Sequence, residues 1–212
     1  MKQPGLRERK KQETRDQIAK TARRLFMERG FDAVTVADVA SEAEVSRKTV
    51  FNYFPTKEDL FYYRMEAFEA RLLEAIRSRA PGESIVAPFA RFLTDARGML
   101  RADEPAAADQ LAATARMIVE SPALLAREQQ IYAGYAAALA ELIAEETDAG
   151  PDDVVPRVAA DAMIGLHKAL VDYVRGRLLA GERDRARIVR GLRRQAREAA
   201  GMLENGLGRL GT

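Results

Sequence analysis

The sequence predicts an all-α protein in which an N-terminal three-helix helix-turn-helix domain precedes a larger helical domain. Ala, Leu, Glu and Arg dominate the 212 residues, and no stretch alternates Val, Ile or Thr with polar residues as a half-buried strand does. Apolar residues instead recur at helical spacing. Short capped patterns crowd the N-terminal part, whereas longer helical patterns fill the rest. We therefore expect two domains, at residues 11–61 and 62–208.

The first helix is predicted to begin near Thr14, because Thr14 and Gln17 match a capping box. Apolar residues then recur on one helical face between Ile18 and Phe26. Gly30 is the expected end of this helix, since glycine adopts the left-handed C-cap conformation without a steric penalty.

The second and third helices are short and are joined by a tight turn. Thr35 and Asp38 form a second capping-box pattern, and the helix that they open is predicted to end around Ala43. Ser46 is the expected N-cap of a third helix that covers residues 47–54.

Pro55 ends the third helix, because the residue before a proline disfavours the α conformation. Thr56 opens a fourth helix, expected over residues 57–79, which links the two domains. Proline and glycine breaks place the remaining helices at about 83–100, 106–119, 122–147, 153–180 and 185–206.

Composition excludes several classes of protein. The chain has no cysteine, which excludes disulfides and thiolate chemistry. No apolar run approaches the roughly 18 residues of a membrane span, and the N-terminus lacks the apolar stretch of a secretory signal. We therefore expect a cytoplasmic protein without a membrane partner. The sequence also lacks a glycine-rich phosphate loop, a nucleophile elbow and a His/Cys cluster, so we expect no enzyme, cofactor or metal.

Charge is unevenly distributed along the chain. The net formal charge is +3 over residues 1–61, −6 over 62–182 and +5 over 183–212. The N-terminal block could meet a polyanion, whereas the middle block would repel one. The arginine-rich last helix could be a second nucleic-acid surface, but a solvated helix face is the simpler interpretation.

The second and third helices are typical of a helix-turn-helix. Val45, Val50 and Phe54 are expected to hold the third helix in place, which leaves its polar side chains outward. Arg and Lys can donate to guanine, and Asn can pair with adenine. The three helix starts could offer backbone N–H groups to phosphates. A solvated helical hairpin is the alternative, but three capped starts around one basic helix favour DNA binding.

Residues spread over 11–61 carry a resemblance to a known family. They are Arg29-Gly30-Phe31, Thr35-Val36, Val39-Ala40, Val45-Ser46, Phe51, Tyr53, Phe54, Lys57 and Leu60. Together they resemble the N-terminal domain of the tetracycline-repressor (TetR) family. Beyond residue 61 the match is limited to helical character and size. The resemblance implies a DNA-binding domain followed by an effector-binding and dimerisation domain.

The resemblance also implies roles for individual residues. Phosphate oxygens would be contacted by Thr35, Ser46, Tyr53 and Lys57. Bases would be read by Arg47, Lys48, Thr49 and Asn52, and Phe51 would pack on a thymine methyl group or a sugar. The partner would be double-stranded DNA with a palindromic operator.

Two residues depart from the family's usual pattern. Family members often carry glycine where Glu44 stands in the turn, and a positive φ there would cost about 1 kcal/mol. Many also carry glycine where Lys48 stands, which allows a close approach of backbone to DNA.

Two apolar stripes mark the last two helices. One comprises Val154, Val155, Val158, Ala162, Leu166, Leu170 and Val174, and the other Ile188, Leu192, Ala199 and Leu203. In the family, helices of this kind form a four-helix interface with a partner subunit, which implies a homodimer. The alternative is that the stripes form intramolecular core.

Aromatic and methionine residues of the larger domain are candidates for an effector pocket. They are Phe68, Phe89, Phe92, Met99, Met117, Tyr132, Tyr135, Met163, His167 and Tyr173. Their character favours an apolar or amphipathic effector. The single histidine, His167, is expected to be a hydrogen-bonded core residue, with a polar ligand anchor as the alternative.

These observations favour a DNA-binding transcriptional regulator, a repressor released from its operator by a small effector. The alternative is a helical protein-binding adaptor that does not bind DNA.

Overall fold

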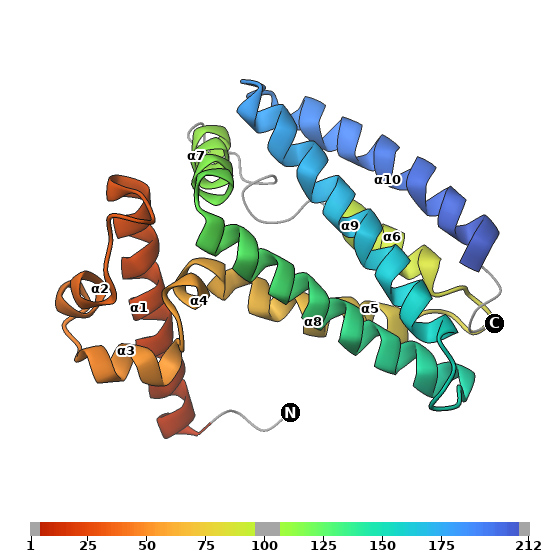
Figure 1. The fold of residues 1–212 in the computed structure, drawn as a ribbon, viewed down its shortest axis with the longest axis horizontal. Coiled ribbons are helices and arrows are strands. Elements are labelled where there is room, and N and C mark those ends of the chain that lie inside the picture. The colour runs from red at the N-terminus through yellow and green to blue at the C-terminus, as the bar shows by residue number, and fades with distance from the viewer. Residues whose placement is uncertain (1–4, 96–106, 208–212) are drawn as a thin grey trace. The chain divides into compact units, whose positions relative to one another are not determined.

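The computed structural model of the chain describes residues 5–95 and 107–207, and these residues form helices and connecting turns without a strand (Figure 1). The predicted all-α class is therefore confirmed. The chain divides into two compact units. We call Met1–Glu66 with Met117–Leu125 the N-terminal unit, and Ala67–Arg116 with Ala126–Thr212 the C-terminal unit.

The N-terminal unit begins with four α-helices and a short 3-10 helix. They are α1 (Leu6–Arg29), α2 (Val36–Glu42), α3 (Arg47–Tyr53), α4 (Lys57–Tyr62) and the 3-10 helix Tyr63–Met65. Helix α1 packs on α2 and α4, and α2 packs on α3. Its core includes the fully buried Ile18, Leu25, Phe26, Val39, Val50, Phe54 and Leu60.

Six further helices follow within the described residues. They are α5 (Glu66–Arg77), α6 (Val86–Thr94), α7 (Ala107–Glu120), α8 (Pro122–Thr147), α9 (Val155–Leu179) and α10 (Arg185–Leu207). Within the C-terminal unit α10 packs on α6 and α9, and α6 packs on α9. Within the described residues no helix is long and apolar enough to cross a membrane.

The predicted start of the first helix at Thr14 is wrong. Helix α1 begins at Leu6, and the Thr14 hydroxyl donates to the Lys10 carbonyl one turn earlier, 3.0 Å away. The residues before Thr14 are mostly good helix formers, so nothing stops the helix from extending. The Gln17 amide does not close a capping box but donates to the Ala43 carbonyl, 3.3 Å away.

Two other predicted helices differ from the structure. The single helix expected over residues 57–79 is divided into α4, the 3-10 helix and α5, although no proline or glycine marks the break. Helix α6 covers Val86–Thr94 rather than residues 83–100. The later start places Pro88 in the first turn, where its missing N–H costs no helical hydrogen bond.

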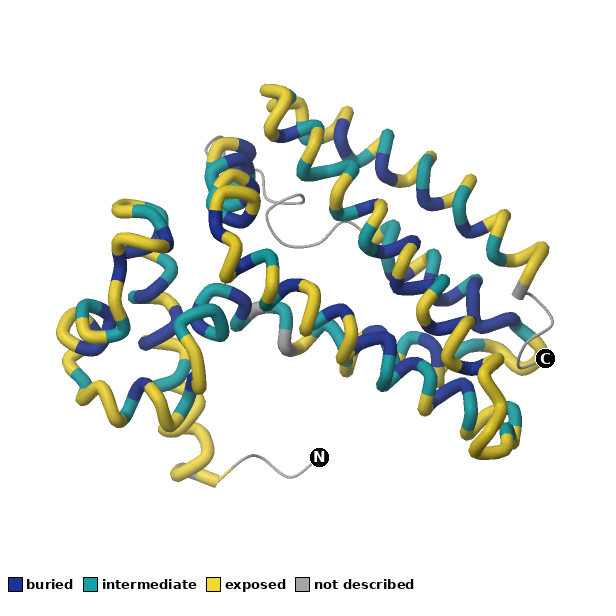
Figure 2. Tube along the Cα trace, in the orientation of Figure 1, coloured by how far each residue is buried: buried dark blue, intermediate teal, exposed yellow. Residues whose placement is uncertain are grey.

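The apolar stripe of α9 is buried over only part of its length. Leu166 and Leu170 are buried, whereas Val154 and Val158 are 68% and 58% exposed. Helix α10 buries one face and exposes the other (Figure 2). Its exposed face carries arginines, and Arg187 and Arg190 form ion pairs with acidic residues at the helix start.

Helices α9 and α10 approach closely at Gly191. A Cβ atom at this position would lie 2.0 Å from the Tyr173 hydroxyl oxygen and 3.0 Å from its ring carbon Cζ. The absence of a side chain at Gly191 therefore makes room for the Tyr173 ring.

We expect Gly191→Ala to lower the free energy of unfolding by about 1–3 kcal/mol, because the Tyr173 ring must leave its position. Gly201→Ala is the matched control in the same helix, since no atom lies within 4 Å of its added Cβ. That control should gain up to about 1 kcal/mol from helix propensity. Urea denaturation measures both, and equal effects of the two substitutions would contradict the assigned contact.

Candidate nucleic-acid interface and effector pocket

Helix α3 has a buried face and an exposed face. Val50 is fully buried and Phe54, its C-cap, is 1% exposed, whereas Val45 in the preceding turn is half-buried. The Phe54 ring packs edge-on against Tyr63 with centroids 5.5 Å apart. The Arg15 guanidinium from α1 lies over the Phe54 ring, 5.3 Å from its centroid. These contacts fix which side of α3 faces outward.

The structure brings most of the predicted DNA-binding residues together on α3. Ser46 caps this helix, and Arg47, Lys48, Thr49, Phe51, Asn52 and Tyr53 lie within it. Thr35 and Lys57 lie instead at the starts of α2 and α4. The exposed members of the set are Thr35, Ser46, Arg47, Lys48, Phe51 and Asn52, and the half-buried ones are Thr49, Tyr53 and Lys57.

The predicted capping box at Thr35 is confirmed. The Thr35 hydroxyl accepts a hydrogen bond from the Asp38 N–H at 3.1 Å. In return, the Asp38 carboxylate accepts from the Thr35 N–H at 2.8 Å and from the Thr35 hydroxyl at 2.6 Å. These bonds hold the pKa of Asp38 below its ordinary value. Thr56 and Asp59 form the same arrangement at the start of α4.

The start of α3 is electrostatically different. The Ser46 hydroxyl accepts from the Thr49 N–H at 3.0 Å, which confirms Ser46 as the N-cap. Among α2, α3 and α4, only α3 has no acidic residue in its first turn. The positive end of its dipole is therefore not offset by a carboxylate, unlike those of its neighbours.

The turn between α2 and α3 follows a Schellman motif. The Val45 N–H donates to the Ala40 carbonyl at 2.9 Å, and the Glu44 N–H donates to the Ser41 carbonyl at 3.2 Å. Glu44 has the left-handed φ of +54° that this motif requires. A residue with a Cβ adopts this conformation at a cost of about 1 kcal/mol, so the condition stated for strain at Glu44 is met.

Lys57 has an internal role that its position in the sequence does not reveal. Its ammonium donates to the Phe31 carbonyl at 3.0 Å and to the Val34 carbonyl at 3.1 Å. The same Nζ atom lies 4.1 Å from the centroid of the Phe31 ring. Lys57 therefore joins the start of α4 to the connection between α1 and α2, and two of its three ammonium protons are used there.

In the C-terminal unit, five of the pocket candidates form one aromatic cluster. Phe68 of α5 contacts the rings of Phe92, Tyr135 and His167, with centroids 5.1, 5.1 and 4.7 Å away. Tyr132 contacts Tyr135 and His167 edge-on. We call these five residues the aromatic cluster. Four of them are buried, and Phe68 is half-buried.

His167 is buried but incompletely hydrogen-bonded. It is 8% exposed, and within the described residues its Nε2 atom has no hydrogen-bond partner. The expectation of a hydrogen-bonded core histidine is therefore not met at this nitrogen. Burial lowers the pKa of His167 to about 4, so the imidazole is neutral at physiological pH.

The remaining pocket candidates lie elsewhere. Phe89 and Met163 are fully buried in the C-terminal unit. Tyr173 occupies the space beside Gly191. Met117 belongs to the N-terminal unit, and Met99 lies outside the described residues.

Sequence reasoning missed a buried ion pair beside the aromatic cluster. Arg175 of α9 donates to the Glu128 carboxylate of α8 at 2.6 Å, with both side chains at most 12% exposed. A signal for it exists, because Leu124, Glu128 and Tyr132 follow at intervals of four and so share the buried face of α8.

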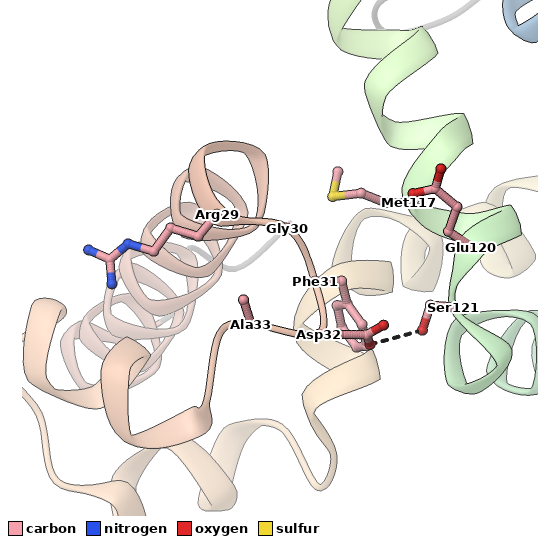
Figure 3. A pocket seen from close by; sticks show the side chains of 8 residues that line it. All are labelled: Arg29, Gly30, Phe31, Asp32, Ala33, Met117, Glu120 and Ser121. Atoms are coloured by element: carbon pink, nitrogen blue, oxygen red, sulfur yellow. Dashed lines mark hydrogen bonds between the residues drawn. The ribbon is translucent and has the colours of Figure 1, made fainter.

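A surface pocket of about 260 Å³ lies in the N-terminal unit. It is lined by Arg29, Gly30, Phe31, Asp32, Ala33, Met117, Glu120 and Ser121. Figure 3 shows the Asp32 carboxylate facing the Ser121 hydroxyl, which donates to it at 3.3 Å, with the Arg29 guanidinium directed away. Nearby, the Tyr62 hydroxyl donates to the Leu124 carbonyl at 3.1 Å. These bonds attach the start of α8 to the N-terminal unit.

Two family models match this chain. The one described as bacterial regulatory proteins, tetR family, matches residues 18–63, and the MftR C-terminal domain matches residues 88–198. The chain is 30% identical over 152 residues to the HTH-type transcriptional regulator TcmR of Streptomyces glaucescens. That alignment covers 71% of this chain and 67% of TcmR.

Solved structures share the fold at lower identity. The fatty acid degradation regulator FadR from Bacillus halodurans is 19% identical with a TM-score of 0.53, over 97% of this chain and 98% of FadR. FadR from Bacillus subtilis, in complex with stearoyl-CoA, is 21% identical with a TM-score of 0.52, over 88% of this chain and 96% of that chain.

We expect Lys57→Met to lower the free energy of unfolding by about 1–3 kcal/mol, because two partly buried carbonyls lose their donor. Lys48→Met is the control, since it removes the same charge from an exposed position and should change stability by less than about 0.5 kcal/mol. Urea denaturation at pH 7 compares them. Equal stability of the two variants would show that Lys57 has no internal role.

We expect His167 to make stability fall as the pH falls from about 6.5 to about 4. In this window the unfolded chain binds a proton at the imidazole and the folded chain does not, because burial lowers the folded-state pKa to about 4. The loss should approach about 3 kcal/mol. His167→Phe lacks this contribution, so urea denaturation at pH 7.5 and 4.5 should show a smaller loss for the variant. The same pH dependence in both proteins would refute a neutral, buried His167.

Proposed function

Because this chain belongs to the tetR family of bacterial regulatory proteins, we propose that it is a repressor released from a palindromic operator by a small apolar or amphipathic effector. Family membership makes it a DNA-binding transcriptional regulator rather than an enzyme. It also decides against an adaptor that does not bind DNA. The observation that best supports the proposed operator contact is the exposed polar face of α3, with its acid-free N-terminus.

On this proposal, α3 enters the major groove and reads bases. Arg47 and Lys48 donate to guanine, and Asn52 and Thr49 make the other polar base contacts. Phe51, 45% exposed on the same helix, is an apolar surface side chain suited to a thymine methyl group or a sugar. Arg47 and Lys48 are exposed, and within the described residues no ion pair engages them at the start of α3. Both observations favour contacts between these side chains and DNA.

Phosphate contacts are proposed around the same helix. Ser46 and Tyr53 flank the base-reading residues and would contact the backbone on either side. The Thr35 hydroxyl already serves its own cap, so we assign its phosphate contact to backbone N–H groups at the start of α2. Lys57 retains one ammonium proton for a phosphate after its two bonds to carbonyls.

A homodimer is proposed to present two α3 helices to two half-sites of a palindrome. Its interface would use exposed apolar side chains of the last two helices. They are Val154, Val155, Val158 and Leu179 from α9 and its start, and Met202 from α10. The three valines, which are exposed close together at the start of α9, favour a protein-protein interface over a solvated surface.

The effector is proposed to bind at the aromatic cluster in the C-terminal unit. Its rings offer flat apolar surfaces, and His167 offers a polar group. The related fold of FadR from B. subtilis binds stearoyl-CoA, which supports an apolar or amphipathic ligand.

Helix α8 is the proposed connection between the effector and the DNA. It begins among residues of the N-terminal unit, where the Leu124 carbonyl accepts from Tyr62. It then carries Tyr132 and Tyr135 of the aromatic cluster. An effector that moves these two rings acts on a helix that is hydrogen-bonded to α4. The effector releases the protein from DNA only if it binds the DNA-incompetent state more tightly than the DNA-binding state.

The test is a gel shift with DNA from the protein's own upstream region, repeated over a salt series. We expect a shift whose affinity falls steeply with salt, since phosphate contacts release counterions. No shift at any salt concentration would sink the repressor assignment.

Arg47→Ala should cost roughly 1–3 kcal/mol in operator binding and relax the preference at one base position. Arg157→Ala removes the same charge from an exposed site on α9 and serves as the control. Selection from randomised operator sequences measures the preference. An unchanged site profile for Arg47→Ala would remove this residue from the base-reading set.

A further inference from the structure

The Phe68 ring stacks on two other rings, and we call the place that it fills the slot. The planes of the Phe68 and Tyr135 rings are 27° apart, and their centroids are separated by 5.1 Å. The planes of the Phe68 and His167 rings are 25° apart, and their centroids are separated by 4.7 Å. Tyr135 comes from α8 and His167 from α9, whereas Phe68 comes from α5. The slot is therefore built by two helices and filled by a third.

Phe68 is also the member of the aromatic cluster that can most readily leave. It is half-buried, whereas Phe92, Tyr132, Tyr135 and His167 are at most 8% exposed. Withdrawal of its side chain therefore gives up a smaller buried fraction than withdrawal of any other ring in the cluster.

His167 adds a polar requirement to this slot. Its Nε2 atom is buried without a partner, and such a group costs about 1–3 kcal/mol relative to one that is hydrogen-bonded. A hydroxyl group can donate or accept, so it satisfies this nitrogen in either imidazole tautomer.

We propose that the Phe68 ring occupies the place of the effector, and that the slot between Tyr135 and His167 takes a planar hydroxyaromatic molecule whose hydroxyl pairs with His167 Nε2. This inference rests on the proposed function, in which the aromatic cluster is the effector site. Phe68 swings outward when the ligand enters, and the ligand's ring inherits the stacking contacts with Tyr135 and His167.

The charges near the cluster favour a neutral ligand over a carboxylate. Arg175 is engaged by the buried Glu128, and Lys168 donates to Gln129 at 2.8 Å. Arg71, which lies over the Phe92 ring, is exposed. These three cations thus already have partners or lie in water, while His167 is neutral.

The test uses the full chain and two probes, 2-naphthol and 2-methylnaphthalene, which are similar in size and differ in the polar hydroxyl. Because the chain has no tryptophan, naphthalene fluorescence is free of indole background. We expect wild-type protein to bind 2-naphthol about tenfold more tightly than 2-methylnaphthalene, a ratio that corresponds to about 1.4 kcal/mol. Equal affinities, a reversed preference or no binding of either probe would overturn the proposal.

Two variants test the roles of the slot residues. His167→Phe keeps a flat ring and removes both nitrogens, so it should bind the two probes equally. Phe68→Ala empties the slot, so it should bind both probes at least about tenfold more tightly and retain the preference for 2-naphthol. A preference that survives in His167→Phe, or weaker binding by Phe68→Ala, would contradict the assignment.

The gel shift with upstream DNA separates this inference from the function on which it rests. A salt-dependent shift without naphthol binding would overturn the hydroxyaromatic slot and leave the repressor intact. Naphthol binding without any DNA shift would sink the repressor and leave the slot as a binding site. Release of the shifted DNA by 2-naphthol, with about tenfold more 2-naphthol needed for His167→Phe, is the result expected if both hold.

Discussion

Burial of Val50 and Phe54 is the constraint on which the N-terminal unit depends. A seven-residue helix has too little intrinsic stability to hold itself, so its orientation comes from the side chains that it buries. Phe54 is fixed further by the Tyr63 ring and the Arg15 guanidinium. With this face committed to the core, Arg47, Lys48 and Asn52 are left in water. The exposed polar face is thus a by-product of packing on the other side of the same helix.

The N-terminal N–H groups of a helix can bind either a capping side chain or a ligand. At α2 and α4 the caps are closed by Asp38 and Asp59, which stabilise the fold but place negative charge where a phosphate would approach. At α3 the Ser46 cap adds no charge. The three helix starts therefore differ in charge, although each is capped by a hydroxyl group.

Residue patterns predicted the features that depend on local chemistry. The caps at Thr35 and Ser46, the inward Val50 and Phe54, and the bounds of α8 all follow from short-range rules. The remaining features depend on residues that are close in space but distant in sequence. The two carbonyls that bind Lys57 lie more than 20 residues away in sequence, and the aromatic cluster combines rings from α5, α6, α8 and α9. At the start of α1 a local pattern was misleading. The capping pattern at Thr14 matches, but it does not prevent the helix from starting earlier, at Leu6.

The hydrogen bond from Tyr62 to Leu124 has a consequence for engineering the chain. Leu124 is fully buried, and the compact unit that contains α1 to α4 includes residues 117–125. A fragment cut after residue 66 would lack this segment and expose the surface that it covers. Chimeras that exchange DNA-binding domains between regulators should therefore include residues 117–125 together with the first 66 residues. The modular unit of this protein is discontinuous in sequence, and recombination at a single junction would divide it.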